Sequence, residues 1–453
     1  MTTQFPAANY YIAASRLRPG LDGGYTVATL ERARNLAACG VQPQLLTFDT
    51  PPMDDVLPGF IGLGLADENT RLRNLFQEAR QRPDWLARAC LDAAPARPPS
   101  ARVTTIDDAD GRPLLELPYV DGADWHRSTE PITVFEPDGS PAGALPGFGA
   151  LYRAWVDAVV AERPGPAVVI VEAKQVGELL GPHPRAYALI HTVHNNHTLD
   201  PFQWDSPMDT LWEGWFAQAD SFDAVLWLTQ AQKADAERRF GPHPEWLVVP
   251  HPAEPPATTG HRTRDPNLAV MLARLSYQKR VDHALRAFAL AVEAHPQAAW
   301  RLEIRGNGPE RASLVALADQ LGIADRVAFR GYVPDASADL EGVGLVCLSS
   351  RYEGQPLTVL EALQAGTPVV SYDVNYGPSE MIEDGVSGRL VPNGDVEGLA
   401  AALAGLLGAP ARIEQYGAAA RRWAQAHGPQ WSMALTRDAV EYALAHRKLL
   451  AEV

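Results

Sequence analysis

The feature that most constrains the fold is a series of short apolar runs along the second half of the chain. Six runs are predicted as strands, at residues 268–272, 300–304, 327–329, 344–348, 368–372 and 388–391. They are apolar throughout and do not alternate with polar residues, which is typical of a parallel sheet covered on both faces. Helical spacing fills the gaps between them, as crossover connections require. This half is therefore predicted to be a doubly wound α/β domain.

The first half begins with the same alternation. An apolar run at residues 10–17 is followed by a glycine-containing loop at 18–24, a helical segment at 26–39 and a second apolar run at 43–48. Later, a helix is predicted at 151–161 and buried strands at 167–172, 187–193 and 224–228. The order strand, loop, helix, strand is that of a second doubly wound α/β domain.

Between these parts of the first half, the pattern changes. Residues 103–106, 114–120 and 132–135 look like short strands, and the turn signals Asp110-Gly111 and Asp138-Gly139 lie near them. Helical spacing is missing between these runs, and Asp-Gly favours hairpin turns. The sequence therefore predicts a small antiparallel β insertion over about residues 98–145.

The domain boundary is predicted at a proline-rich stretch, Pro250–Pro256, which continues as a polar segment. We expect an N-terminal Rossmann-like domain at 1–255 and a second Rossmann-like domain at 256–425, facing each other across a cleft. Residues 426–453 are expected to form a helix that crosses back to the first domain.

Charge and composition narrow the class of protein. The formal net charge is −16, which argues against nucleic acid as the main partner. The three cysteines are far apart and flanked by apolar residues, as buried thiols in a reducing compartment would be. No run of about 20 apolar residues exists, and residues 1–14 lack the pattern of a signal peptide. We expect a cytoplasmic protein.

The segment after the strand at 344–348 carries the strongest chemical signal. Glu353 and Gly354 lie in a loop, Pro356 is suited to be the first residue of a helix, and Gly366 is suited to end it. Unpaired N–H groups and the helix dipole make such a start an anion site. We therefore predict that backbone N–H groups of residues 354–358 hold phosphate or sugar oxygens. These residues are Gly354, Gln355, Pro356, Leu357 and Thr358, and all except Pro356 have an N–H group.

Glu361 is the one charged residue between Glu353 and Asp373. At helical spacing it shares a face with apolar side chains such as Leu357 and Leu360. A carboxylate in such a helix needs partners. Sugar hydroxyls would serve, since a carboxylate accepts several O–H donors, but a buried arginine or a backbone N–H would serve equally.

Two cations follow the strand at 268–272, Arg274 and Lys279. At the carboxyl end of a parallel strand, the two side chains could bind a diphosphate. The Arg guanidinium can donate two parallel hydrogen bonds to phosphate oxygens, and the Lys ammonium supplies a point charge. Solvated surface charge is the alternative.

Glycine and histidine give two weaker signals in the first half. Gly23 and Gly24 allow close approach to a ligand or merely a tight turn, and the three spaced glycines of a dinucleotide site are missing, which disfavours NAD. His191, His194 and His197 end a strand. Zinc is disfavoured because His191 and His194 would point to opposite faces. One histidine is expected in the cleft, and the sequence leaves open which one.

Together these motifs resemble a known family. The segments Arg274–Lys279, Ile304–Glu310, Val327–Val333 and the pair Glu353 and Glu361 are similar to the retaining glycosyltransferases of family 4, which have the GT-B fold. The resemblance covers about residues 269–408. Two further segments, Ser371–Glu380 and His194–His197, resemble the branch that glycosylates wall teichoic acids and serine-rich repeat adhesins. The β insertion is similar to that branch too, where it helps in acceptor binding or assembly.

The resemblance implies a role for each site residue. Glu353 would contact donor sugar hydroxyls and Glu361 the ribose, while Arg274 and Lys279 would neutralise the diphosphate. Backbone near Tyr332 would meet the base, Gly23 and Gly24 would lie near the phosphates, and His194 would contact the sugar.

The expected activity is transfer of a hexose or N-acetylhexosamine, with retention, from a nucleoside-diphosphate sugar, UDP by family default. No metal or cofactor is expected. The acceptor hydroxyl would belong to a polyol-phosphate polymer of the cell wall or surface, a protein Ser or Thr, or a small molecule. The enzyme would be a homo-oligomer or monomer, peripheral to the inner face of the membrane. A sugar-nucleotide epimerase, a phosphorylase and a non-catalytic partner subunit are the alternatives.

Overall fold

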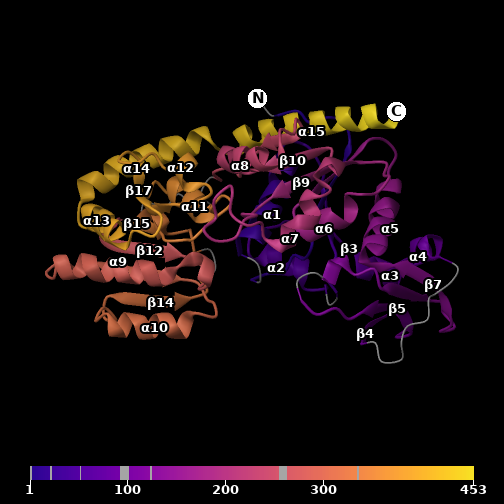
Figure 1. Cartoon of the computed structure of the whole chain (residues 1–453), viewed down its shortest axis with the longest axis horizontal. Coiled ribbons are helices and arrows are strands. Elements are labelled where there is room, and N and C mark those ends of the chain that lie inside the picture. Colours follow the sequence, from indigo (N-terminus) through magenta and orange to yellow (C-terminus); the bar gives the residue numbers. More distant parts are fainter. Residues whose placement is uncertain are drawn as a thin grey trace.

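The computed structural model describes residues 3–20, 23–50, 53–91, 102–122, 125–254, 263–333 and 336–452. Two α/β halves lie side by side, and a small antiparallel sheet extends from the first half (Figure 1). The predicted α/β class with a β insertion is confirmed. The domain boundary predicted at residues 255–256 lies outside the described residues.

The first half is built on a seven-stranded parallel sheet in the order β11-β10-β9-β8-β1-β2-β3. Its strands are β1 (Asn9–Ala14), β2 (Gln44–Thr47), β3 (Arg71–Asn74), β8 (Ala167–Val171), β9 (Ala188–Val193), β10 (Ala224–Trp227) and β11 (Trp246–Val248). The order reverses between β1 and β8, so their carboxyl ends border the crevice where doubly wound sheets bind ligands. Most of these strands are buried from end to end, which is why they read as continuous apolar runs.

Helices cover this sheet. They are α1 (Gly23–Ala38), α2 (Val56–Gly62), α3 (Leu75–Gln81), α4 (Asp84–Ala89), α5 (Gly147–Ala161), α6 (Lys174–Leu180), α7 (Thr210–Phe216) and α8 (Gln230–Phe240), with 3-10 turns at Trp125–Arg127 and Ala219–Ser221. Gly23 and Gly24 are the first residues of α1 and not part of the loop before it, a correction to the predicted helix start.

The insertion is a four-stranded antiparallel sheet, β4 (Val103–Asp107), β5 (Pro113–Pro118), β6 (Pro131–Phe135) and β7 (Pro141–Pro146). Three strands were predicted. The fourth, β7, was missed because its sequence Pro-Ala-Gly-Ala-Leu-Pro has the composition of a turn. Ile132, Val134 and Leu145 pack into the same core as α5. The predicted beginning, residues 98–101, lies outside the described residues.

The second half has a six-stranded parallel sheet in the order β14-β13-β12-β15-β16-β17. Its strands are β12 (Asp265–Leu272), β13 (Arg301–Arg305), β14 (Val327–Gly331), β15 (Val343–Leu348), β16 (Val369–Asp373) and β17 (Gly388–Pro392). Its helices are α9 (Val281–Ala294), α10 (Arg311–Gln320), α11 (Leu357–Gln364), α12 (Pro378–Met381), α13 (Val396–Leu406) and α14 (Pro410–Ala426), with 3-10 turns at Tyr277–Lys279 and Leu340–Gly342. The order reverses between β12 and β15.

The last helix, α15 (Pro429–Glu452), leaves the second half and lies along the first (Figure 1). Met433, Ala439 and Val440 belong to the core that β1 and α1 form. Its amino end is anchored where Ser432 Oγ donates a hydrogen bond of 2.8 Å to the carbonyl of Pro250. The two halves therefore share a helix as well as a linker.

Among the described helices, no single one is long and apolar enough to cross a membrane. One pair, Val396–Leu406 with Pro410–Lys448, passes that test when taken together, but the two helices meet at 102°.

Candidate active site

The switch point of the second sheet brings two predicted motifs together. Loops after β12 and β15 begin on either side of it, and hydrogen bonds join them. The backbone N–H of Arg351 donates to the carbonyl of Gln278 at 2.8 Å. The side-chain amide of Gln278 donates back to the carbonyl of Tyr352 at 3.2 Å. The two loops thus form one continuous wall at the carboxyl edge of the sheet.

Lys279 and Glu353 form an ion pair within that wall. Lys279 Nζ lies 2.6 Å from Glu353 Oε1, and Ser350 Oγ donates to the same oxygen at 2.6 Å. Glu353 is 5% exposed, so the two donors compensate the burial of its charge. Lys279 was predicted to face a diphosphate and Glu353 a sugar, and the structure shows these two groups bonded to each other.

Arg274 lies at the exit of β12 with its side chain exposed. In the described part of the chain it has no hydrogen-bond or ion-pair partner. Two glycines pack closely against the backbone on either side of Arg274. A Cβ on Gly306 would lie 2.0 Å from the carbonyl oxygen of Ala273, and a Cβ on Gly308 would lie 2.1 Å from the carbonyl oxygen of Leu275. Arg274 is therefore a cation on a rigid support, facing solvent.

Tyr332 lies at the same edge of the sheet. The carbonyl of Gly331 accepts a hydrogen bond of 2.7 Å from the N–H of Gly306, which joins this segment to the glycine loop. The Tyr332 side chain is 56% exposed. Its backbone is thus held while its ring projects outward.

The start of α11 faces the first half of the molecule. Pro356 is the N-cap and Leu357 the first helical residue, one position later than predicted. A Cβ on Gly354 would lie 2.1 Å from the carbonyl oxygen of His194, so only glycine permits this approach. The Gln355 side chain accepts a hydrogen bond of 2.7 Å from the N–H of His251. Gly354 and Gln355 thus connect the predicted anion site to the first half.

Gly24 meets the same helix start. A Cβ at Gly24 would lie 3.4 Å from Leu357 Cδ1, while one at Gly23 would meet nothing within 4 Å. The first turn of α1 therefore lies against the Leu357 side chain at the start of α11.

Glu361 lies near two carboxylates that sequence reasoning missed. Burial raises the pKa of Glu31 to about 8, and the nearby charges of Glu254 and Glu361 add to the effect. Glu254 in turn accepts a hydrogen bond of 2.5 Å from Asn35 Nδ2. Three carboxylates from distant parts of the sequence thus gather between α1 and α11, and Glu31 retains a proton at neutral pH.

His194 is held by a buried ion pair. Its Nε2 lies 2.6 Å from Glu172 Oε2, and Arg32 Nε lies 2.5 Å from Glu172 Oε1. Burial would raise the pKa of Glu172, but Arg32 and His194 outweigh it and hold that pKa well below the usual range. Since Nε2 is engaged by the carboxylate, Nδ1 is the remaining polar atom of the His194 ring.

The other two histidines are core residues. Burial lowers the pKa of His191 to about 3 and that of His197 to about 4, so both are neutral. His191 packs on Trp215 and Phe222, and His197 packs on Phe216 and Trp227. Of the three, His194 is the one with an exposed side-chain surface, 16%.

Glu172 and Arg32 were not predicted as site residues. Glu172 follows directly after β8, a strand buried from end to end, at the switch point of the first sheet. A charge in that position was a usable signal. Arg32 gave none, because it lies in the middle of an ordinary helix and its partner is far away in the sequence.

A cavity of about 1270 Å³ opens beside His194. Its lining includes Glu172 and Tyr25 from the first half, Tyr119 from the insertion, and Tyr277 from the second half. Lys279, Glu353 and Glu361 are not among its lining residues. The cavity therefore borders the two loops of the second switch point, through Tyr277 and Tyr352, without including the Lys279–Glu353 pair.

Hydrogen bonds also join the two halves of the molecule directly. The N–H groups of Gln230 and Ala231, at the start of α8, donate to the Glu380 carboxylate at 2.9 and 2.8 Å. Tyr376 OH donates to Asp235 at 3.0 Å. The segment 371–380, singled out by its resemblance, thus serves as a contact between halves.

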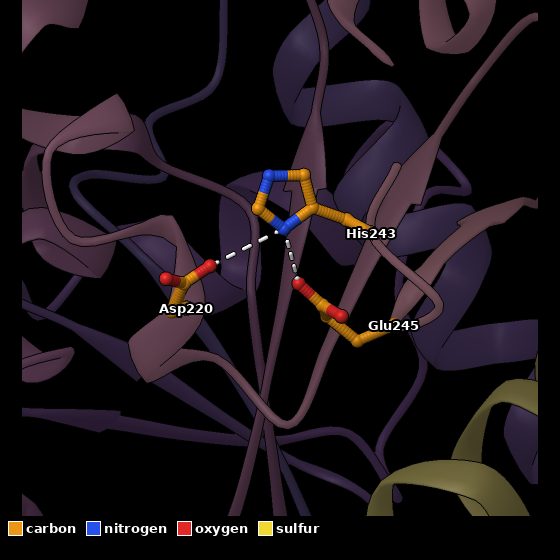
Figure 2. A group of neighbouring side chains, drawn as sticks. All are labelled: Asp220, His243 and Glu245. Carbon is orange, nitrogen blue, oxygen red and sulfur yellow. Dashed lines mark hydrogen bonds and ion pairs between the residues drawn. The ribbon is translucent and has the colours of Figure 1, made fainter. Parts of the chain in front are cut away.

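A group of potential metal ligands lies elsewhere. In the residues that the structure describes, Asp220, His243 and Glu245 have ligand atoms within 4.8 Å of one another (Figure 2). His243 Nδ1 already lies 3.2 Å from Asp220 and 2.8 Å from Glu245, and the Asp220 side chain is 86% exposed. These contacts join the turn before β10 to the start of β11 as an ion-pair cluster. None of the three lines the cavity.

Comparison with known proteins agrees with this geometry. Residues 260–423 match the family of glycosyl transferases group 1. That stretch carries both loops of the second switch point and all of α11. The second half is therefore similar to group 1 glycosyl transferases, and the predicted resemblance to the GT-B glycosyltransferases is confirmed.

Individual relatives match in part. An exopolysaccharide phosphotransferase of Streptomyces coelicolor is 38% identical over 44% of this chain and 21% of its own length. The poly(glycerol-phosphate) alpha-glucosyltransferase of Bacillus subtilis is 28% identical over 42% of this chain and 28% of its own. The chain thus spans less than a third of either relative.

A solved structure matches over nearly the whole chain. S. aureus TarM, in a complex that includes UDP, superposes with a TM-score of 0.76 at 16% identity, covering 96% of this chain and 99% of that one. At that identity the likeness establishes the GT-B fold.

Proposed function

We propose that this protein is a glycosyltransferase that moves a hexose or N-acetylhexosamine, with retention, from a UDP-linked donor to an acceptor hydroxyl. The observation that carries the proposal is the meeting of two switch points. Arg274, the Lys279–Glu353 pair and the start of α11 come from one sheet, and His194 with its buried Glu172 comes from the other.

The donor would lie with its diphosphate between Arg274 and the start of α11. The exposed guanidinium and the N–H groups of the helix start would stabilise the charge that develops as the diphosphate leaves. Lys279 would add a positive charge nearby while its ion pair holds the Glu353 side chain in place. Both hydrogen bonds to Glu353 fall on Oε1, so Oε2 is the oxygen that would accept from a donor sugar hydroxyl.

Retention without a covalent intermediate is supported by the state of Glu172. It is the carboxylate that contacts His194, yet its side chain has no exposed surface, and Arg32 and His194 each engage one of its oxygens. A nucleophile needs an accessible oxygen. We infer that the acceptor attacks on the face from which the diphosphate leaves, and that a diphosphate oxygen takes its proton. Positioning and charge stabilisation then carry the catalysis, without a metal.

The test is a panel of UDP-hexoses and UDP-N-acetylhexosamines, with thermal shift reporting binding and UDP release reporting turnover. Arg274→Ala is expected to lower kcat about 100-fold or more, the usual cost of one charge-stabilising group. Arg301→Ala is the matched control, because Arg301 is 60% exposed and begins β13, away from the carboxyl edge where Arg274 lies. Equal activity in the two variants would refute the diphosphate assignment. A new nucleotide sugar formed without acceptor would instead indicate an epimerase.

A further inference from the structure

The cavity beside His194 is larger than a site for one small molecule needs. Such sites usually occupy about 300–1,000 Å³, and this one measures about 1270 Å³. It extends from His194 to the β insertion, where Thr104 and Tyr119 line it, and to the second half, where Tyr352 does. An occupant of several linked units would fill it.

Aromatic rings make up much of the lining. They are Tyr25, Phe48, Phe76, Tyr119, Trp125, Phe148, Tyr152, Phe202, Trp212, Tyr277 and Tyr352. Tyr119 is 45% exposed, and Trp125 packs edge-on against Phe148 at a centroid distance of 5.1 Å. Sugar rings present faces of C–H groups, whose slight positive charge suits the negative face of an aromatic ring. Serine-rich peptides and polyol-phosphate chains lack such flat apolar faces.

The charge of the lining is unsuited to a polyanion. Among the described residues that line the cavity, the cations are Arg16 and Lys174, and the carboxylates are Asp49, Glu172, Asp200 and Asp209. Lys174 is paired with Glu178 at 3.4 Å, Asp49 with Arg18 at 2.8 Å and Glu172 with Arg32 at 2.5 Å. Among the described lining residues, Asp200 and Asp209 are therefore the carboxylates without an ion pair. An excess of carboxylates repels phosphate groups, and the net charge of −16 adds to the repulsion.

Several buried polar atoms of the described lining residues lack a hydrogen-bond partner, and one of them belongs to Asn196. Asn196 Oδ1 accepts hydrogen bonds from the N–H and the hydroxyl of Thr198, at 2.7 and 2.8 Å. Asn196 is 5% exposed, and its Nδ2 is buried without a hydrogen-bond partner in the described structure. An unpaired buried donor is costly. A hydroxyl oxygen of a bound sugar would satisfy it, and Asn196 follows His194 by two residues.

We propose that the acceptor is an uncharged glycan, which lies under the β insertion against the aromatic lining and presents its reactive hydroxyl at His194. This inference rests on the proposed function and adds the acceptor class to it. The reaction joins the acceptor oxygen to the anomeric carbon, breaks the bond from that carbon to the diphosphate, and leaves the acceptor proton on the released UDP.

The experiment compares three acceptor classes with the donor that the wild-type protein binds. These are neutral oligosaccharides, polyol-phosphate oligomers and a serine-rich peptide, each measured by UDP release over the slow hydrolysis seen without acceptor. We expect the neutral oligosaccharides alone to accelerate UDP release. Their KM should stay constant between about 50 and about 500 mM NaCl, since no charges attract them.

Two variants test the lining. Tyr119→Ala should raise the acceptor KM about tenfold, the effect of losing one stacking ring, and leave the donor Kd unchanged. Tyr119→Phe keeps the ring and should restore the wild-type KM. Asn196→Ala should likewise raise the acceptor KM and leave the donor Kd unchanged.

The proposal is overturned if polyol phosphate or peptide is the preferred acceptor. It is also overturned if no acceptor accelerates UDP release in a protein that binds and slowly hydrolyses its donor. A protein that binds no UDP-sugar at all contradicts the proposed function itself, which is a separate result.

Discussion

The buried ion pair of Glu172 permits a quantitative test of how the first half supports the site. The Glu172 side chain has no exposed surface, and Arg32, its partner at 2.5 Å, is 6% exposed. Glu172→Gln keeps the shape and removes the charge, so Arg32 is left as an uncompensated buried cation. Breaking a buried pair from one side costs about 3–5 kcal/mol of unfolding free energy. Urea unfolding, followed by tryptophan fluorescence, measures the loss.

A second glutamate provides the control. Glu162 bonds to Arg73 by two hydrogen bonds of 2.7 Å, but its side chain is 43% exposed. Glu162→Gln should cost less than about 1 kcal/mol, because solvent screens exposed pairs. If Glu172→Gln lowers the free energy of unfolding no more than Glu162→Gln does, the Glu172–Arg32 ion pair does not stabilise the position of His194. That result would refute the reasoning from burial.

Three further substitutions test the facing helix starts. Glu361→Gln should weaken binding of the UDP-sugar by isothermal titration calorimetry, because a carboxylate is the stronger acceptor for ribose hydroxyls; an unchanged Kd would assign Glu361 a structural role. Glu31 has a folded-state pKa raised by burial to about 8, so the folded protein holds a proton that the unfolded chain loses above about pH 4.5, and stability should fall as pH rises from about 5 to 8. Glu31→Gln should flatten that pH dependence of Tm and raise Tm at pH 8, and an identical pH profile would contradict the burial of Glu31. Gly354→Ala would place a Cβ 2.1 Å from the carbonyl oxygen of His194, so turnover should fall about tenfold or more and about 1–3 kcal/mol of stability should be lost to overpacking. Gly62→Ala, at a helical glycine with open space around it, should change neither, and equal effects of the two alanines would argue against the close approach.

Most of the fold was predictable because its signals are local. Most strands of both parallel sheets are apolar runs, but β3, with the sequence Arg-Leu-Arg-Asn, is not and was missed. Errors occurred where residues act against their usual tendency. Strand β7 is bounded by Pro141 and Pro146, and Gly23 and Gly24 open a helix in place of a loop.

The loop motifs of the second half were visible in the sequence because they follow strands directly. What the sequence could not indicate is which of those residues bond to each other. Lys279 and Glu353 are far apart in the chain, and only the reversal of strand order between β12 and β15 brings them to 2.6 Å. The same is true of Arg32 and Glu172, and of the carboxylates of Glu31, Glu254 and Glu361. Long-range pairing of this kind depends on topology, which no local pattern encodes.

Turnover of a UDP-sugar is the most direct test of the central claim. The measurement is UDP release by the wild-type protein and by Arg274→Ala, across the donor panel, in EDTA. We expect the wild type to bind and turn over at least one donor without metal, and Arg274→Ala to bind that donor but turn it over about 100-fold more slowly. Absence of any bound donor, or full turnover in Arg274→Ala, would contradict the proposed transfer reaction.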